Sequence, residues 1–598
     1  MTTLNTQPTA ITMALSDFNM DLPMNPLLWL TDSYKISHIL FETDGVAEIY
    51  SNFTARFDKY ISRMCGEAWD GKFVVFGIQY LILRLNHYFK VGFFDRDKEE
   101  VIQEMKDVLG PYINQEKYDH FERLHDLGYL PVVIKALPEG TLAPVTTPFF
   151  TIRNTVPEME WVPNYLETII SSDLWKQLTV ATIGRLFRKI SNEFAMQTQG
   201  NLLGTEWQNH NFSFRGQPGW ENSSISGVAF LLSSCGTDNV SSLYAAKKFY
   251  NSTNKQGLLA GSVPASEHSV GTLGILVEQY RAKIRALRDS SLEEIDLIEA
   301  ERRYTQRNLT ERFPTGIFSN IADSFDYWAF VTEIVPSLKP EIMARDGKFV
   351  IRGDSGNPVH IIAGYRIQQF TKDYNGDAYE SWDEVEVDIG VDGSYPEVVE
   401  FNGEYKLVKW DFEHEDELMF KLEDITRAEA IGTIECLWET FGGTLNELGY
   451  RVLDSHIGMI YGDGINLERS QEILTRLKEK KYVSTNIVFG VGSYSLSMLS
   501  RDHLGMAIKA TNAIVDIEGE IVDAPIYKEP KTDSSKKSLR GLIQVIGDEE
   551  GNVVGYNDKQ SRDEEDSGLL QVVYKDGQVI EDKLQTVFQI RERLWGKQ

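Results

Sequence analysis

The sequence predicts a mixed α/β protein whose central zone consists of parallel βα units and whose two ends mix short strands with helices. From about residue 180 to 515, apolar runs, polar turns and amphipathic helical patterns alternate, which is typical of parallel βα units. Residues 25–179 instead mix short β-rich runs, such as 132–136, with helical patches such as 77–89. The central zone is therefore expected to form a barrel or a doubly wound sheet.

This pattern divides the chain into four segments. Residues 1–24 lack a basic start and a continuous apolar run, so we expect a flexible leader rather than a signal peptide. Residues 25–179 are expected to form an α+β domain, and residues 180–515 a βα domain. After residue 515 the chain returns to short strands, and residues 516–598 are expected to pack on the N-terminal domain. With 598 residues, 42% of them hydrophobic, the chain can bury the cores of two domains.

The charge and the cysteines limit the possible partners. A formal net charge of −29 disfavours nucleic acid, because a phosphate backbone is bound by a basic face. An anionic substrate must then be bound by local clusters of positive charge. The three cysteines show no CxxC spacing, so neither a disulfide framework nor a zinc site is indicated, and a reducing cytoplasm is expected. No apolar run has the length that spans a bilayer, so no membrane partner is expected.

Several apolar runs of the central zone end in polar or glycine-containing clusters. Parallel βα folds place their chemistry at the carboxyl ends of the strands, so these clusters are expected on one active-site rim. The clusters are residues 212–216, 236–238, 262–268, 323–326, 352–355, 462–464 and 490–493.

An acidic segment interrupts this spacing at residues 372–417, which are crowded with Asp, Glu, Tyr, Trp and Gly. Charged and apolar residues alternate from Glu384 to Asp388. This alternation indicates a solvated β-hairpin insertion rather than a pair of catalytic acids.

Two glycine-containing turns follow one another on the predicted parallel scaffold. The run IYGDGINLERSQEIL (460–474) is an apolar strand, a GDG turn and an amphipathic helix, and FGVGSYSLSMLSRDHL (489–504) repeats the design. Glycines let the backbone approach a ligand closely, and the free N–H groups at a helix start favour anions. One such turn is usually only a turn. Two in succession favour a phosphate cradle.

Candidate catalytic side chains stand at other predicted strand ends. The run SVPASEHS (262–269) contains His268, ADSFD (322–326) contains Asp323, and IRGDSGNP (351–358) contains Arg352 and Asp354. A lone His is more often structural than catalytic, and acids at strand ends usually cap turns. Their joint occurrence weakens these structural interpretations, and His268, Asp323 and Asp354 stay candidates for catalysis.

Short motifs follow one another from about residue 25 to 588, interrupted by the acidic insertion. They are TDSYKISH (31–38), YSNFTARF (50–57), FGIQY (76–80), IKALPEG (134–140), TVAT (179–182), HNFSFRG (210–216), GTDNV (236–240), SVPASEHS, ADSFD, IRGDSGNP, YGDG (461–464), FGVGS (489–493) and SRD (500–502). Together they resemble the nicotinamide phosphoribosyltransferase family, in a bacterial or viral type. The resemblance implies a type II phosphoribosyltransferase-like irregular β/α barrel, with an α+β domain built from the N-terminal and C-terminal segments. It also implies a homodimer with active sites at the interface.

The resemblance assigns residues to the base and the ribose. Nicotinamide would stack between Phe212 and Tyr34, the latter from the partner subunit, because aromatic faces suit a ring that becomes a cationic pyridinium. Asp238 matches the acid that accepts the carboxamide N–H, and Arg352 matches the arginine that recognises the base. The positions that match the ribose site are Asp354, Gly462 and Asp463.

The resemblance also assigns residues to phosphate groups. The positions that match the 5′-phosphate site are Arg215, Gly492 and Ser493. Basic positions near the pyrophosphate and ATP phosphates, some contributed across the dimer, are Arg56, Arg501, Lys509, Lys528 and Lys536. They would supply the local positive charge that an anionic substrate requires, although any single one of these lysines is also compatible with a solvated surface.

His268 matches the family's phosphorylated histidine, and Asp323 matches the acid that orients its imidazole. ATP would then be a co-substrate whose hydrolysis drives phosphoribosyl transfer from phosphoribosyl pyrophosphate to nicotinamide, giving nicotinamide mononucleotide and pyrophosphate in NAD salvage. Mg²⁺ would neutralise the leaving pyrophosphate.

Two other functions stay open at this point. Nicotinate phosphoribosyltransferases share the barrel, but a carboxylate at Asp238 would repel the carboxylate of nicotinate. A catalytically silent binding protein could keep the same fold.

Ser493 and Tyr494 stand where the family has glycines, so the shape of the phosphate loop is a further open point.

Overall fold

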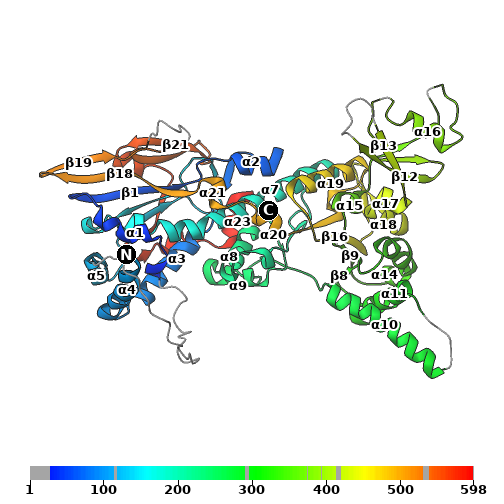
Figure 1. Ribbon diagram of the computed structural model, residues 1–598, viewed down its shortest axis with the longest axis horizontal. Coiled ribbons are helices and arrows are strands. Elements are labelled where there is room, and N and C mark those ends of the chain that lie inside the picture. The colour runs from blue at the N-terminus through cyan, green and yellow to red at the C-terminus, as the bar shows by residue number, and fades with distance from the viewer. Residues whose placement is uncertain are drawn as a thin grey trace, which may run out of the picture. The chain divides into compact units, whose positions relative to one another are not determined.

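The computed structural model comprises two compact units, and Figure 1 shows their helices and strands. One unit contains residues 1–57, 77–175 and 505–585, and the other contains residues 58–76, 176–504 and 586–598. The residues that the structure describes are 27–113, 117–289, 295–373, 375–391, 393–411, 419–528 and 538–596. The predicted leader, residues 1–24, lies outside them. Within the described ranges, no helix combines the length and the apolar character that crossing a bilayer requires.

The first unit is built on a seven-stranded sheet in the order β19-β18-β1-β5-β3-β22-β23, in which every neighbouring pair is antiparallel. Strands from the N-terminal segment are β1 (Val46–Thr54), β3 (Val132–Ala136) and β5 (Phe150–Asn154). Strands from the C-terminal segment are β18 (Ala507–Ile517), β19 (Glu520–Pro525), β22 (Gln571–Lys575) and β23 (Gln578–Val579). The two ends of the sequence therefore share one sheet.

The same unit contains a hairpin and several helices. The hairpin is formed by β20 (Leu542–Gly547) and β21 (Val553–Gln560). The helices are α1 (Ser33–Ser37), α3 (Ile78–Phe89), α4 (Lys98–Ile113), α5 (Asp119–Leu127), α6 (Val162–Tyr165) and α22 (Arg562–Asp566).

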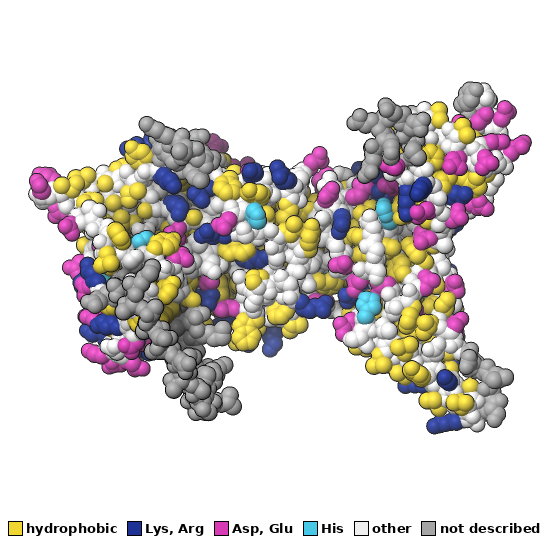
Figure 2. Space-filling model, in the orientation of Figure 1, with side chains coloured by type: hydrophobic (Ala, Val, Ile, Leu, Met, Phe, Trp, Pro, Cys, Tyr) yellow, Lys and Arg dark blue, Asp and Glu magenta, His cyan; other side chains and the backbone are white. Residues whose placement is uncertain are grey.

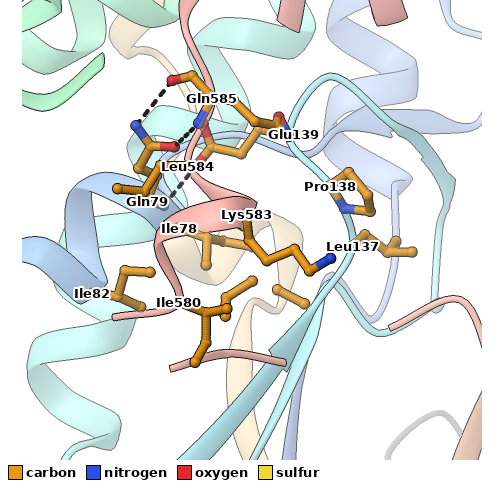
Figure 3. Close-up of a pocket in the computed structure, with 12 residues that line it drawn as sticks. Ile78, Gln79, Ile82, Leu137, Pro138, Glu139, Ile580, Lys583, Leu584 and Gln585 are labelled. Atoms are coloured by element: carbon orange, nitrogen blue, oxygen red, sulfur yellow. Dashed lines mark hydrogen bonds between the residues drawn. The ribbon is translucent and has the colours of Figure 1, made fainter. Parts of the chain in front are cut away.

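A buried carboxylate, that of Glu139, caps the start of α3. Oε1 of Glu139 accepts hydrogen bonds from the backbone N–H groups of Gly77 and Gln79, at 2.9 and 2.8 Å, which satisfies two donors that a helix start leaves without intrahelical partners. The Gln79 amide in turn exchanges two hydrogen bonds with the backbone of Gln585 (Figure 3). The cavity beside them measures only about 30 Å³. We therefore interpret this cluster as structural, linking the start of α3 to the C-terminal segment.

The second unit is built on a six-stranded sheet in the order β7-β6-β17-β16-β9-β8, and every neighbouring pair is parallel. The strands are β6 (Asn209–Asn211), β7 (Gly236–Thr237), β8 (Phe318–Ile321), β9 (Phe349–Gly353), β16 (Ile457–Tyr461) and β17 (Ile487–Val491). Single parallel bridges, Gly236–Gly261 and Ala265–Ser319, join the segment after α9 to both edge strands. The sheet is thus a curled half-barrel, and the predicted irregular β/α barrel is confirmed.

Helices alternate with these strands, as the sequence pattern predicts (Figure 1). They are α2 (Lys59–Cys65), α7 (Glu167–Gln199), α8 (Trp220–Leu231), α9 (Val240–Tyr250), α10 (His268–Asp289), α11 (Leu297–Arg307), α12 (Tyr327–Ala329), α13 (Val335–Ser337), α14 (Lys339–Met343), α15 (Pro358–Ala363), α17 (Arg427–Ile431), α18 (Thr433–Phe441), α19 (Leu467–Glu479), α20 (Ser493–Ser497) and α21 (Arg501–Leu504). The division between the units falls within α7, after Trp175.

The acidic insertion forms a sheet of its own, in the order β10-β11-β12-β13. Its strands are β10 (Ile367–Gln369), β11 (Val398–Phe401), β12 (Glu404–Asp411) and β13 (Met419–Ile425). They enclose a small apolar cluster that includes Phe370, Val399 and Phe401. Figure 2 shows acidic side chains gathered over this part of the surface.

One prediction for the insertion is wrong. The alternating run from Glu384 to Asp388 was expected in a β-hairpin, but it lies in helix α16 (Trp382–Asp388). The Ser381 side chain accepts a hydrogen bond from the Glu384 N–H and caps this helix. Val385 is fully buried whereas Val387 is 73% exposed, because a helix turns residues two apart to different faces while a strand would not.

The predicted domain boundaries also need correction. The predicted boundary after residue 515 falls inside strand β18. This strand continues to Ile517 and pairs with β1 on one side and with β19 on the other. Residues 58–76 belong to the second unit, where Asp70 pairs with Arg185 at 2.7 Å. The last helix, α23 (Val587–Trp595), also belongs there rather than with the N-terminal domain. Its Arg591 guanidinium donates to four backbone carbonyls of that unit, those of Leu231, Ser234, Leu258 and Leu259.

Candidate active site

Six of the seven predicted polar clusters lie at the carboxyl edge of the parallel sheet, directly after or at the ends of β6, β7, β8, β9, β16 and β17. The seventh, residues 262–268, follows the Gly236–Gly261 bridge and leads into α10. Because all six strands are parallel, their ends share one edge. The topology therefore brings together residues that are far apart in the sequence.

His268 and Asp323 form the first pair at this edge. Nε2 of His268 lies 3.0 Å from Oδ1 of Asp323. The histidine side chain is 49% exposed while the aspartate is only 3% exposed. The other carboxylate oxygen, Oδ2, accepts hydrogen bonds from the Asp354 N–H at 3.0 Å and from the Ser355 hydroxyl. Asp323 is thus oriented by the turn after β9 and can itself orient an accessible imidazole.

Asp238 forms a second hydrogen-bonded group. Its Oδ1 accepts from the Ser262 hydroxyl at 2.7 Å and contacts Nε2 of His210 at 2.9 Å. Burial favours the neutral acid, but the hydrogen bonds from His210 and Ser262 outweigh it and lower the pKa of Asp238 below its ordinary value. The Asp238 side chain is 45% exposed. The site therefore presents an ionised carboxylate to an open space.

Phe212 and Arg352 form the next part of the edge. The Arg352 guanidinium lies over the Phe212 ring, 5.4 Å from its centroid, and Nη2 of Arg352 is 2.8 Å from Oδ2 of Asp354. The two glycine turns flank the same ring. A Cβ built at Gly490 would be 2.4 Å from Phe212, and one at Gly462 would be 3.3 Å from it and 2.4 Å from Asp354. Any side chain at these glycines would displace the ring or the carboxylate.

Phe212, Asp238 and Arg352 line a cavity of about 450 Å³ within the half-barrel. Its polar lining includes His210, Asp238, Ser262 and Arg352, and the Phe212 ring forms part of its wall. Much of the remaining lining is apolar, with Trp207, Val263, Ile317, Val350, Ile460 and Val488. An apolar cavity with a few convergent polar groups is the usual form of a small-molecule site. The arrangement suits a flat ring that carries a polar substituent.

The residues predicted for the 5′-phosphate lie at neighbouring segments. Arg215 is in the short helix η7 (Phe214–Gly216), and Ser493 begins α20. A Cβ at Gly216 would be 1.9 Å from the Ser493 hydroxyl, so the two segments touch at these residues. Tyr494 is 58% exposed, so its ring does not fill the loop.

Three of the five predicted basic residues line one cavity of about 280 Å³ in the first unit. These are Arg56, Lys509 and Lys528. Nε of Arg56 donates to the Gly505 carbonyl at 2.8 Å, and Nζ of Lys509 is 3.1 Å from Glu167. The cavity thus carries three cationic side chains, the kind of group that attracts phosphate.

The remaining predicted site residues that the structure describes do not line either of these two cavities. Arg501 lies in the second unit and pairs with the neighbouring Asp502 at 2.7 Å. Tyr34 lies in the first unit and is 55% exposed, with its ring 5.3 Å from that of His38. Asp463 follows Gly462 at the end of β16 and is exposed. Lys536 lies outside the described residues.

A statistical model of the nicotinate phosphoribosyltransferase (NAPRTase) family matches residues 207–592, which include the whole sheet edge described above. The chain belongs to this family. Members of the family are pentosyltransferases, and this chain is therefore an enzyme that carries out phosphoribosyl transfer in NAD salvage.

Three curated relatives of this NAPRTase-family chain are named nicotinamide phosphoribosyltransferase. That of Acinetobacter baylyi is 33% identical over 585 residues, which cover 96% of this chain and 98% of the relative. Those of Mycoplasma pneumoniae and Xanthomonas campestris pv. campestris are each 27% identical, over 86% and 88% of this chain and 96% and 88% of the relatives. The resemblance found from the motifs is confirmed.

Two residues that the structure places at the site of this family member have no role among those predicted from the sequence. His210 contacts Asp238 and lines the cavity, and Ser262 donates to the same carboxylate. His210 could have been found, because it lies two residues before Phe212 and alternate strand residues share a face. Ser262 carries no comparable signal, since it stands in an irregular segment.

Proposed function

We propose that the protein transfers the phosphoribosyl group of phosphoribosyl pyrophosphate to nicotinamide, giving nicotinamide mononucleotide and pyrophosphate. The observation that carries this proposal is the ionised Asp238 carboxylate in a largely apolar cavity that the Phe212 ring also lines. The names of the curated relatives agree with it.

The choice of nicotinamide rests on the free oxygen of Asp238. Both hydrogen bonds to this carboxylate end on Oδ1, and no donor among the described residues reaches Oδ2. Oδ2 is therefore available to accept the carboxamide N–H. Nicotinate offers no such donor and adds like-charge repulsion, which disfavours it in a partly desolvated cavity.

The chemistry needs little covalent participation from the protein. The pyridine nitrogen donates its lone pair to C1 of the ribose as the C1–O bond breaks, and the electron pair of that bond leaves with pyrophosphate. Positive charge develops on the ribose and then on the pyridinium ring. In this proposal the Phe212 face, the Asp238 carboxylate and Asp354 position the reactants and stabilise this charge.

We further propose that ATP phosphorylates His268 and so drives the transfer. Its accessible imidazole and buried Asp323 partner support this role. With Nε2–H donating to Asp323, the lone pair of Nδ1 remains available to attack the γ-phosphorus of ATP, while the bond to the bridging oxygen breaks and ADP leaves.

Mg²⁺ is the metal we propose for the reaction. It binds through one or two carboxylates together with substrate phosphates, so a site without a dedicated cluster fits it. Within the described ranges, no group of three or more His, Cys, Asp or Glu side chains could bind a metal by itself. Asp354 and Asp463 are the carboxylates at this edge that could contribute. When bound, the ion would neutralise the leaving pyrophosphate.

The basic cavity of the first unit supports a role for a second subunit. We propose a homodimer in which Tyr34 and the cations at Arg56, Lys509 and Lys528 complete the partner's site. Mixing inactive Tyr34→Ala and Asp354→Ala subunits should then regenerate activity, because one of the two hybrid sites is intact. No recovery despite proven subunit exchange would contradict a shared site.

A substrate panel tests the proposed reaction. Nicotinamide, nicotinate and quinolinate are each supplied with phosphoribosyl pyrophosphate and Mg²⁺, with and without ATP, and pyrophosphate release is measured. We expect release with nicotinamide that ATP stimulates. A preference for nicotinate would instead favour the activity for which the family is named.

We also expect the enzyme in the cytoplasm, since its free cysteines, Cys65, Cys235 and Cys436, are buried thiols.

A further inference from the structure

Helix α7 places one lysine against the short helix α20. Lys176 is 1% exposed, and its ammonium donates to the Leu496 carbonyl and, at 2.9 Å, to the Ser497 hydroxyl. Both acceptors belong to the last residues of α20, whose first residue is Ser493. The buried ammonium therefore fixes one end of the segment that carries the predicted phosphate ligand at its other end.

Ser497 also connects α20 to the segment that contains Arg215. The Ser497 hydroxyl donates to Oε1 of Gln217 at 3.2 Å, and Gln217 directly follows the η7 helix that contains Arg215. The Ser495 hydroxyl donates to the Ile465 carbonyl at 2.7 Å, just after the GDG turn. One network of hydrogen bonds thus connects α20 with both η7 and the ribose turn.

We infer that Lys176 is a positioning residue for the 5′-phosphate subsite, because it fixes α20 so that Ser493 and Arg215 meet the phosphate together. The inference rests on the proposed function, in which this subsite receives phosphoribosyl pyrophosphate. Lys176 acts through α20 and Gln217, without contact to the substrate.

The physical chemistry of the contact supports this role. A hydrogen bond from a charged donor is about twice as strong as a neutral one, and a cation at the last carbonyls of a helix is favourable. Burial lowers the pKa of Lys176 to about 7. A rise of the pH through this value removes the charge, so the constraint on α20 should weaken in alkaline solution.

The substitution Lys176→Met tests the inference, because it removes the charge and the hydrogen bonds at similar length. The KM for phosphoribosyl pyrophosphate should rise about tenfold, the effect of losing a hydrogen bond from a charged donor, while the KM for nicotinamide stays within about twofold. In Lys176→Arg the low KM should be largely restored. This variant should also lack the rise in KM that we expect for the native enzyme above pH 7, since arginine stays charged.

Lys480 provides a matched control. Its pKa is also lowered by burial, to about 8, and its Nζ donates to the Ile431 carbonyl at 2.8 Å. Lys480→Met should change the thermal stability without changing the KM for phosphoribosyl pyrophosphate. If both variants raised this KM equally, the effect would be general loss of structure, and the inference would be overturned.

Two further variants make the outcome decisive. If Lys176→Met does not fold, Ser497→Ala tests the same link, because it removes the acceptor and the bond to Gln217. Arg215→Ala tests the subsite itself. The inference alone is contradicted if the native enzyme is active and Arg215→Ala raises the KM for phosphoribosyl pyrophosphate, while Lys176→Met and Ser497→Ala leave it unchanged. A native enzyme that forms no nicotinamide mononucleotide contradicts the proposed function instead.

Discussion

Two regions of the second unit are rich in carboxylates, the edge of the parallel sheet and the inserted sheet between β10 and β13. At the edge, Asp323 bonds to a residue 55 positions earlier and to others 31 and 32 positions later. In the insertion, Asp373 accepts from backbone groups only two and four positions away. The number of acids does not distinguish a functional site from a solvated surface. For these two acids the hydrogen bonds do, because only those of Asp323 join distant strand ends.

The largest effect that would follow from this difference is expected at Asp323. Replacing it by Ala removes the acceptor for His268 and for the β9 backbone, so substrate-stimulated ATP hydrolysis should fall about 100-fold or more. Hydrolysis is measured as ADP release with and without nicotinamide. Asp373→Ala, a carboxylate with local bonds only, is the control and should hydrolyse ATP at the native rate. Equal losses in both variants would contradict the distinction between the regions.

The next largest effect concerns substrate choice at Asp238. Asp238→Asn removes the repulsive charge and supplies an amide that can donate to nicotinate. A hydrogen bond to a charged group contributes about 1.5–3 kcal/mol, so nicotinamide use should fall by about one to two powers of ten. The ratio of kcat/KM values should shift toward nicotinate. An unchanged ratio in a folded variant would place amide recognition elsewhere, with Arg352 the next residue to test.

A smaller effect is expected at the glycine beside the aromatic ring. The Cβ of Gly490→Ala would lie 2.4 Å from Phe212 and 2.9 Å from the Gly462 backbone, so the ring must move. The KM for nicotinamide should rise about tenfold, as expected for an overpacked site that costs about 1–3 kcal/mol. Gly92→Ala, which meets nothing within 4 Å, is the steric control. A native KM in Gly490→Ala would show that Phe212 does not bind the base.

At Glu301, a buried acid close to the sheet edge, we expect an effect on the pH dependence of stability. It is 2% exposed, and burial together with the charges of Asp323 and Asp326 raises its pKa to about 8. The folded protein therefore binds more protons than the unfolded chain between about pH 4.5 and 8, so this group lowers stability as the pH rises across that window. Glu301→Gln should have a flatter dependence of the unfolding free energy on pH, measured by denaturant titration at pH 5, 6.5 and 8. The same slope in both proteins would show that Glu301 ionises normally.

The smallest effect is expected in the insertion. Asp383 and Glu386 are exposed on α16. The double variant Asp383→Asn, Glu386→Gln should change kcat/KM by less than about twofold and stability by less than about 0.5 kcal/mol. A larger loss of activity would show that the acidic surface takes part in the reaction, and the contrast with the sheet edge would fail.

Most of the candidate site could be located from the sequence because each residue follows a strand in a motif. Phe212, Asp238, Asp354 and the two glycine turns could be found in this way. Lys176 carries no such signal, since it stands within a long helix, and the only signal for His210, which stands inside a strand, is its place two residues before Phe212. Their partners are 28 residues away in one case and 320 in the other, and only the folded chain brings them together.

The sequence by itself determined the alternation of strands and helices, the parallel sheet and the order of its motifs, because hydrophobic periodicity and turn residues act over short distances. Only the tertiary structure decided where the units divide, that residues 382–388 form a helix, and which carboxylate bonds to which partner. These outcomes depend on packing between segments that are remote along the chain. Val385 illustrates the reason: its local pattern is compatible with a strand, but the small core of the insertion accepts that one side chain and leaves Val387 in solvent.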